Sequence, residues 1–346
     1  FGRYRFVLPE YEIIRMDGEC TFTWNCLSDS ELDTEWLRQN FAQYVEENMQ
    51  IVNTPAVSTQ GRKTEYCCSR ENIPPESQWG ELARSLVNEI KVRAVDKIVL
   101  ARKVNLKFDT PLNPFVMLKQ IQAQSPQAYS FLIRFPDSGV FFGCSPERLF
   151  KKDGIVLYSE AIAGTRPVAG DSDENSRLQT ELHQSQKEIQ EHAFVADTVR
   201  DAMHSVCENV FCTESSKVVA AASVQHLFTR FEGKLSKTTK LCDIFDALHP
   251  TAAVNGVPFQ KAMLTIRSRE PFSRGWYAGS VGWIASDAAE FATAIRSALL
   301  NNSEILSVFA GAGLVRDSVP DQEWQETEHK LRLILEAVEK VIGSKV

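Results

Sequence analysis

The chain has 346 residues, a hydrophobic content of 43% and a formal net charge of −7 at pH 7. The length allows about two domains or one large one, and the apolar content excludes wholesale disorder. The acidic balance and the lack of a basic run argue against nucleic acid and membrane as partners, and no apolar stretch reaches the roughly 20 residues of a membrane-spanning helix.

The N-terminal residues 1–75 carry few signals, and we interpret them as a variable N-terminal layer. Short apolar runs predict strands at 6–8 and 21–24, and a helix is expected over 32–48. The pair Pro74-Pro75 marks a boundary.

Sharper patterns begin after this boundary. Apolar side chains recur at helical spacing from Trp79 to Ile90, which predicts a helix with Ser77 as a possible N-cap. Residues 97–108 alternate as a strand does, with Lys97 on the face opposite to Ile98. Further strands are expected at 129–135, 139–143 and 155–159.

The second half continues this mixture. A polar loop is expected from Gly164 to Pro167, then a single long helix over about 175–208. Pro320 suits the first turn of a last helix, and Gly343 suits its end. Helices and strands do not alternate regularly, which favours an α+β fold. Strand-rich sequence lies near 217–230 and over about 276–315.

The cysteines and the first residue bear on the compartment. Eight cysteines are irregularly spaced and form no CxxC pair, so neither a zinc site nor a disulfide framework is expected. Free thiols suit a reducing compartment. We predict a cytoplasmic protein, or one of an organelle stroma if a transit peptide was removed, because the chain begins at Phe1 and not at Met.

Two acidic pairs suggest a metal. Glu188 and Glu191 are three residues apart on one predicted helix, and Glu323 and Glu326 are three apart on another. This spacing places each pair on one helix face. Four converging carboxylates would repel each other without a cation, and oxygen ligands of this kind suit Mg²⁺. Ordinary exposed acids, which the first turn of a helix favours, are the alternative.

A lysine and a glutamate suggest acid–base chemistry. Lys97 heads an apolar strand, and burial there would lower its pKa so that it could act as a base. An edge-strand lysine that prevents aggregation is the alternative. Glu147 follows a Ser-Pro turn and could donate a proton if it is desolvated. Pairing with Arg148 or Lys151 is the alternative there.

Several positions could bind an anion. Strand alternation over 291–298 would place Arg296 among small residues, where it could grip a carboxylate or form an internal ion pair. Lys330 lies four residues after Glu326, as a site residue or as a solvated salt bridge. His226 alone is more often a core histidine. Glycine-containing turns at 163–165, 249–256 and 311–313 could bring backbone N–H groups to an anion.

Ten segments of the sequence match motifs of one enzyme family, and they follow each other in the order of that family. They are KIVLARKV (97–104), GCSPERLF (143–150), SEAIAGTRP (159–167), QKEIQEH (186–192), VQHL (224–227), LHPTAAVNG (248–256), RGWYAGSVGW (274–283), EFATAIRSAL (290–299), FAGAGLV (309–315) and DQEWQETEHKL (321–331). With these segments the chain resembles the chorismate-utilising enzymes, and most closely the isochorismate synthases. Ala252 departs from the commoner proline of the HPTPAV pattern.

The resemblance implies a fold, a substrate and a metal. The fold would be α+β, a single large domain over 1–346 with two antiparallel sheets packed face to face and flanking helices. Residues 97–343 would form the catalytic region. The substrate would be chorismate. Mg²⁺ would be held mainly by Glu191 and Glu326, with Glu188 and Glu323 near it.

The resemblance also implies a reaction. Ammonia-adding members usually have glutamine at the position of Lys97, and aminodeoxychorismate synthases have lysine at the position of Ala163. The pattern here is therefore similar to that of the water-adding members. Lys97 would deprotonate water that attacks C2 of chorismate, and Glu147 would protonate the departing C4 hydroxyl. The product would be isochorismate, for menaquinone, siderophore or salicylate biosynthesis.

Three rival functions remain. A salicylate synthase shares the same acid, base and metal residues, an anthranilate synthase component would use ammonia, and a non-catalytic chorismate-binding protein would lack turnover. We expect no glutaminase subunit, and a monomer or weak homodimer. By resemblance, the substrate would be bound by Gly164, Thr165, His226, Thr251, Tyr277, Arg296, Gly311, Gly313 and Lys330.

Overall fold

The computed structural model describes residues 5–9, 11–16, 19–25, 33, 35–36, 38–43, 68–135, 139–221 and 224–343. The chain divides into a small unit of residues 2–64 and a large unit that contains residues 65–346 and Phe1. The single domain expected over 1–346 stays a prediction.

The described residues of the small unit include an antiparallel hairpin. Strands β1 (Tyr11–Met16) and β2 (Glu19–Trp24) pair, and β2 confirms the strand expected at 21–24. The strand expected at 6–8 is wrong. Residues 5–9 have no regular structure, since apolar character alone does not supply a partner strand. Of the helix expected over 32–48, the described residues 35–36 and 38–43 are helical, and most of the rest lies outside the described residues.

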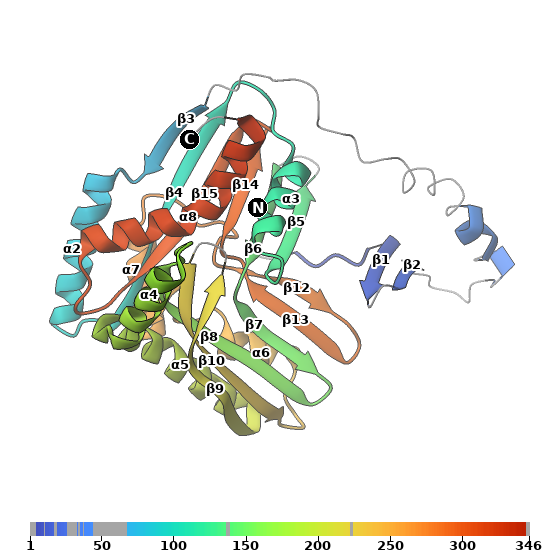
Figure 1. Cartoon of the computed structure of the whole chain (residues 1–346). Coiled ribbons are helices and arrows are strands. Elements are labelled where there is room, and N and C mark those ends of the chain that lie inside the picture. Colours follow the sequence, from blue (N-terminus) through green and yellow to red (C-terminus); the bar gives the residue numbers. More distant parts are fainter. Residues whose placement is uncertain are drawn as a thin grey trace. The chain divides into compact units, whose positions relative to one another are not determined.

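The large unit mixes helices and strands (Figure 1). Its helices are α2 (Glu76–Lys91), α3 (Pro114–Gln124), α4 (Ser172–Gln184), α5 (Gln186–Val206), α6 (Leu241–Leu248), α7 (Phe259–Arg269) and α8 (Pro320–Ile342). Its strands are β3 (Cys68–Ile73), β4 (Lys97–Phe108), β5 (Tyr129–Phe135), β6 (Gly139–Ser145), β7 (Arg148–Asp153), β8 (Val156–Pro167), β9 (Cys207–Ala221), β10 (Val224–Leu235), β11 (Gly256–Val257), β12 (Ser280–Ile284), β13 (Ala288–Thr293), β14 (Ser297–Asn301) and β15 (Ile305–Leu314).

The strands form two antiparallel sheets, which confirms the α+β class. One sheet has the order β12-β13-β7-β8-β10-β9, and the other has the order β11-β4-β15-β14-β6-β5, with β3 paired to β4. The sheets contact each other where the hydroxyl of Tyr129 on β5 donates to Glu290 on β13, at 2.8 Å. The ring of Phe141 on β6 also packs against Trp276, in the turn that precedes β12, at 5.9 Å between centroids.

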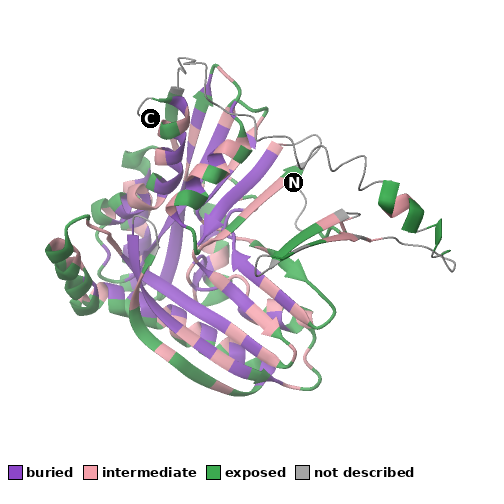
Figure 2. Cartoon of the chain, turned by 45° about the vertical axis from the view of Figure 1, so that its right-hand side comes forward, coloured by how far each residue is buried: buried purple, intermediate pink, exposed green. Residues whose placement is uncertain are grey.

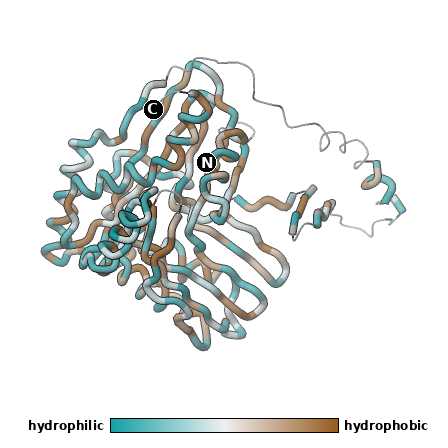
Figure 3. Tube along the Cα trace, in the orientation of Figure 1, coloured by the Kyte–Doolittle hydropathy of each residue, from teal (hydrophilic) through white to brown (hydrophobic). Residues whose placement is uncertain are grey.

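Helices cover the sheets with their apolar stripes. Helix α5 packs on β8 and β10, and α8 packs on β15 (Figure 1). The stripe of α8 is buried from Leu331 to Ile342, and each such side chain stabilises the fold by about 1.5–3 kcal/mol. Figure 2 shows the buried residues running along the strands, and Figure 3 shows hydrophobic segments in the same sheets. Among the described helices, none is both long and apolar enough to cross a bilayer.

The chain crosses between the sheets twice near one place. It leaves the seven-stranded sheet after β6 and enters the six-stranded sheet at β7, through Pro146 and Glu147. After an intervening visit to the seven-stranded sheet at β11, it crosses back to that sheet again between β13 and β14, through residues 294–296. Glu147 thus lies in the predicted turn. Arg296 does not lie in the continuous strand expected over 291–298, because it adopts φ 51° in the second crossing.

Other expected boundaries shift for local reasons. Helix α2 begins at Glu76 after Pro75, so Ser77 lies inside the helix and is not its N-cap. The long helix expected over 175–208 is two helices, because Ser185 ends α4 and its hydroxyl caps α5 by accepting from the Glu188 N–H. The expected loop from Gly164 to Pro167 is the end of β8. The last helix does begin at Pro320 and end at a left-handed Gly343, as predicted.

Candidate active site

The two predicted acidic pairs meet in space. Glu188 and Glu191 on α5, and Glu323 and Glu326 on α8, are all buried, with exposed fractions of 3%, 5%, 2% and 8%. The ammonium of Lys187 lies among them, 3.0 Å from Glu323 Oε1 and 3.4 Å from Glu188 Oε1. It is also 3.4 Å from Glu191 Oε2 and 3.5 Å from Glu326 Oε2. The alternative of ordinary exposed acids is therefore wrong.

The crowding perturbs these groups. Burial raises the pKa of Glu323 to about 8, and repulsion from Glu326 and Glu191 adds to it. Burial would also raise the pKa of Glu326, but Lys330 and Lys187 outweigh it and hold that pKa below its usual value. Burial would lower the pKa of Lys187, yet the surrounding carboxylates raise it well above its usual value. The ammonium therefore stays charged.

This cluster is suited to a hard cation. Its donors are carboxylate oxygens, and a positive charge already lies at their centre. Among the described residues, no three His, Cys, Asp or Glu side chains are arranged to hold a metal ion. The carboxylate oxygens match the ligand chemistry of Mg²⁺, but in this structure they are arranged around the Lys187 ammonium.

Lys97 adjoins the cluster from β4. Its side chain is fully buried, and Nζ lies 3.3 Å from Glu191 Oε1 as an ion pair, with no hydrogen bond to it from the described part of the chain. Burial lowers the pKa of Lys97, and the carboxylate of Glu191 opposes this shift without cancelling it. The strand is not an exposed edge, because β4 pairs with β15 on one side and with β3 and β11 on the other.

Two glycines on β15 make room for these groups. Gly313 pairs with Val99, and a methyl group there would overlap Glu191 Oε1 and lie 3.0 Å from Lys97 Cε. A methyl group on Gly311 would lie 3.1 Å from the hydroxyl of Tyr277. The glycines are needed here for close approach.

Glu147 is a buried acid held by two hydroxyls. Its side chain is 2% exposed, and Oε1 accepts from Thr293 Oγ1 at 3.0 Å and from Thr251 Oγ1 at 3.4 Å. Burial raises the pKa of Glu147 to about 7, against the two hydroxyls and the nearby charge of Lys97. Arg148 pairs with Glu160 and Glu290 instead, so the alternative that Glu147 pairs with it is wrong.

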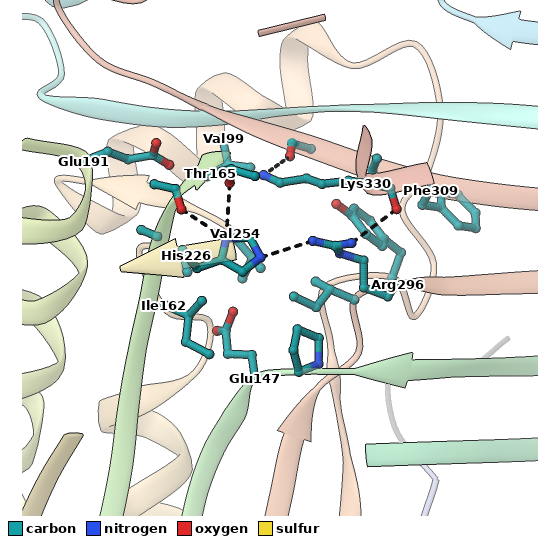
Figure 4. Close-up of a pocket in the computed structure, with 18 residues that line it drawn as sticks. Val99, Glu147, Ile162, Thr165, Glu191, His226, Val254, Arg296, Phe309 and Lys330 are labelled. Carbon is teal, nitrogen blue, oxygen red and sulfur yellow. Dashed lines mark hydrogen bonds between the residues drawn. The ribbon is translucent and has the colours of Figure 1, made fainter. Parts of the chain in front are cut away.

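Glu147 points into a pocket between the two sheets (Figure 4). In that view Glu191 and Lys330 lie on the side of the pocket opposite to Glu147, and His226 and Arg296 lie between the two sides. Ala163 lines the wall and contributes no amine at its own position. Of the predicted binding residues, the pocket is lined by Gly164, Thr165, His226, Tyr277, Arg296, Gly311 and Lys330.

A hydrogen-bond chain orders the pocket wall. The His226 Nδ1 lies 3.0 Å from the carbonyl oxygen of Gly164, which can only accept, so Nδ1 carries the proton. Its Nε2 then accepts from Arg296 Nη2 at 3.3 Å. Burial and the charge of Arg296 lower the pKa of His226 to about 3, which keeps it neutral. Lys330 Nζ donates to Glu326 at 2.6 Å and to the carbonyl of Gly311 at 2.9 Å.

The remaining predicted residues lie close by. Thr251 reaches the pocket through its hydrogen bond to Glu147, and Gly313 lies beside Glu191 and Lys97. Burial raises the pKa of Tyr277 to about 12, so its hydroxyl stays protonated. Sequence reasoning missed Lys187 and Thr293. Lys187 precedes Glu188 and could have been found from its position, whereas Thr293 is 146 residues from Glu147 and carries no such signal.

The comparisons with known proteins decide the family. The family model described as "chorismate binding enzyme" matches residues 1–339. The chain belongs to the chorismate-binding enzymes. It is 38% identical over 264 residues to the isochorismate synthase MenF of Bacillus subtilis (strain 168), which is 76% of this chain and 56% of that protein.

Members with another activity are similar as well. The anthranilate synthase component 1 of Saccharolobus solfataricus is 38% identical over 267 residues, 76% of this chain and 62% of that protein.

The solved structure of the menaquinone-specific isochorismate synthase MenF of Escherichia coli gives a TM-score of 0.81 at 29% identity, covering 95% of this chain and 75% of that one. The chain thus spans 56–62% of the length of these two curated relatives.

Proposed function

We propose that this chorismate-binding enzyme is an isochorismate synthase that adds water at C2 of chorismate and removes the C4 hydroxyl. The observation that carries the proposal is that two buried titratable groups serve the same pocket: Glu147 lines it, and Lys97 lies 3.3 Å from Glu191, which also lines it. Burial lowers the pKa of Lys97 and raises that of Glu147 to about 7. Their pKa values thus approach each other, as a base and an acid at neutral pH require.

The proposed reaction uses both groups in one displacement. Neutral Lys97 takes a proton from the water that attacks C2, and both ring double bonds shift as the C4–O bond breaks. Protonated Glu147 gives its proton to the C4 oxygen, which leaves as water. One water enters and one leaves, so isochorismate has the composition of chorismate. Lys97 then returns its proton to solvent, and Glu147 regains one before the next turnover.

The choice of water over ammonia rests on two positions. Lys97 supplies the base that water needs for deprotonation and ammonia does not need. Ala163 lines the pocket without an amine that could compete as a nucleophile. An ammonia supply is then unnecessary, so we expect no glutaminase partner.

We further propose that the four buried glutamates hold Mg²⁺. Glu191 and Glu326 would be its main protein ligands, with Glu188 and Glu323 near it. When bound, Mg²⁺ would offset the negative charge of the substrate ring carboxylate. Arg296 and Lys330 would bind the enolpyruvyl carboxylate, and neutral His226 would orient Arg296 through its Nε2.

Product identification tests the proposal against its rivals. The protein is incubated with chorismate and Mg²⁺, with and without ammonium, and the products are separated by chromatography. We expect isochorismate in both reactions. Salicylate as the main product would favour the salicylate synthase, anthranilate that appears only with ammonium would favour the ammonia-using component, and unchanged chorismate would favour a non-catalytic binding protein.

The pathway that this chain serves is set by the enzyme that uses isochorismate as its substrate. Relatives carry names that include menaquinone-specific and 2,3-dihydroxybenzoate-specific isochorismate synthases. We propose that this chain supplies one such pathway, for menaquinone, siderophore or salicylate formation.

A further inference from the structure

The two oxygens of the Glu147 carboxyl have different surroundings. Oε1 accepts from the hydroxyls of Thr293 and Thr251, at 3.0 Å and 3.4 Å. No hydrogen bond within the described part of the chain reaches Oε2. Glu147 lines the pocket that Thr165 and Arg296 also line. The carboxyl group is therefore polarised by its fixed neighbours before any substrate binds.

Thr293 is built into this position by its backbone. It ends β13, its side chain is 1% exposed, and its N–H donates to the carbonyl oxygen of Glu147 at 3.0 Å. The same residue thus binds Glu147 twice, once through the main chain and once through the hydroxyl. The main-chain bond fixes the distance between the two residues, which holds the hydroxyl on Oε1.

A hydroxyl donor favours one protonation pattern. A protonated carboxyl has one carbonyl-type oxygen that accepts and one O–H that donates. Two hydroxyls that both donate to Oε1 make it the accepting oxygen, so the proton belongs on Oε2. We propose that Thr293, assisted by Thr251, positions Glu147 so that Oε1 remains the acceptor and Oε2 alone carries the proton that is transferred. This inference rests on the proposed function only for the use made of that proton.

Infrared titration of the ligand-free protein tests the protonation pattern without turnover. The band of the protonated Glu147 carboxyl is identified by subtracting the spectrum of Glu147→Gln, and its intensity is followed against pH. Thr293→Val keeps the side-chain shape and the main-chain bond but removes the hydroxyl. Because a donor to the carboxylate stabilises the charged form, its loss should raise the midpoint by about one pH unit.

The same spectra report the bonding of Oε1. With one donor fewer, the C=O band of Thr293→Val should move to higher wavenumber. Thr293→Ser keeps the hydroxyl and should restore both band and midpoint. Thr327→Val is the matched control, because Thr327 is also fully buried but its hydroxyl serves Arg102. An unchanged midpoint and band in Thr293→Val, or a Thr293→Ser protein that behaves like Thr293→Val, would overturn the proposal.

Turnover then links the pattern to the reaction. We expect Thr293→Val to lower kcat about tenfold with KM within about twofold, because the acid is mispositioned and the binding groups are intact. Thr251→Val should shift the midpoint in the same direction and by less, since its hydroxyl is farther from Oε1. A midpoint that moves with kcat unchanged would contradict the role of Thr293 in transfer. A Glu147→Gln protein with normal turnover would instead contradict the proposed function.

Discussion

Removal of the Lys97 amine should abolish most of the turnover. Lys97→Met keeps the length of the buried stem and removes Nζ, which lies 3.3 Å from Glu191 Oε1. A positioned general base contributes about 10²–10⁴ in rate. The nearby His192 is a poor substitute, because burial lowers its pKa to about 4, and burial lowers the pKa of His226 in the pocket to about 3. We therefore expect a loss of about 10³ or more in kcat, roughly 4 kcal/mol in activation free energy.

The fold should survive this change. Glu191 keeps the Lys187 ammonium at 3.4 Å, so its carboxylate is not left without a cation, and the methionine fills the space of the buried lysine stem. The assay measures isochorismate formation by chromatography at saturating chorismate and Mg²⁺, alongside thermal unfolding. Lys107→Met on the same strand, where the side chain is exposed, is the matched control and should retain the rate. A folded Lys97→Met protein with more than about a tenth of the wild-type kcat would refute the reasoning.

The remaining predictions concern the acid, the cation cluster and pH. Glu147→Gln still offers an oxygen to Thr251 and Thr293 but has no transferable proton. We therefore expect kcat to fall about 10²–10⁴-fold with little change in thermal unfolding. A near-normal rate would contradict the acid role. Lys187→Met leaves four buried carboxylates without their shared ammonium. Urea unfolding in the presence of a chelator should show a free energy of unfolding lower by about 3–5 kcal/mol, and added Mg²⁺ should restore part of it. Unchanged stability would argue against the cluster. The pKa of His226 is lowered from 6.5 to about 3, so its contribution to stability falls as pH falls through 6.5. Between pH 7 and pH 5, urea unfolding should show that the wild type loses about 2 kcal/mol more stability than His226→Gln. Equal losses would contradict the burial of a neutral ring.

Much of the fold follows from local pattern in the sequence. The apolar residues of the strand at 97–108 largely hold one face, and the last helix has Pro320 at its start and Gly343 just after its end, so their bounds can be predicted. The acidic pairs are also readable, because spacing of three residues fixes their common helix face. That they converge follows from the sequence only through the family resemblance.

Features that depend on long-range packing could not be predicted. The segment around Arg296 alternates as a strand does, yet the chain changes sheets there and Arg296 takes a left-handed backbone. The break at Ser185 depends on a cap inside a helical pattern. Thr293 and Glu147 are 146 residues apart in the sequence, and they meet only because the two connections between the sheets lie side by side. Tertiary contacts decide such positions.

Isotope tracing tests the central claim most directly. Chorismate is turned over in water enriched in oxygen-18, and the product is separated and its mass measured at low conversion. Attack of water at C2 with loss of the C4 hydroxyl predicts isochorismate that carries one oxygen-18 atom, formed by the wild-type protein and not by Lys97→Met. Isochorismate without the label, or a product other than isochorismate, would contradict the account.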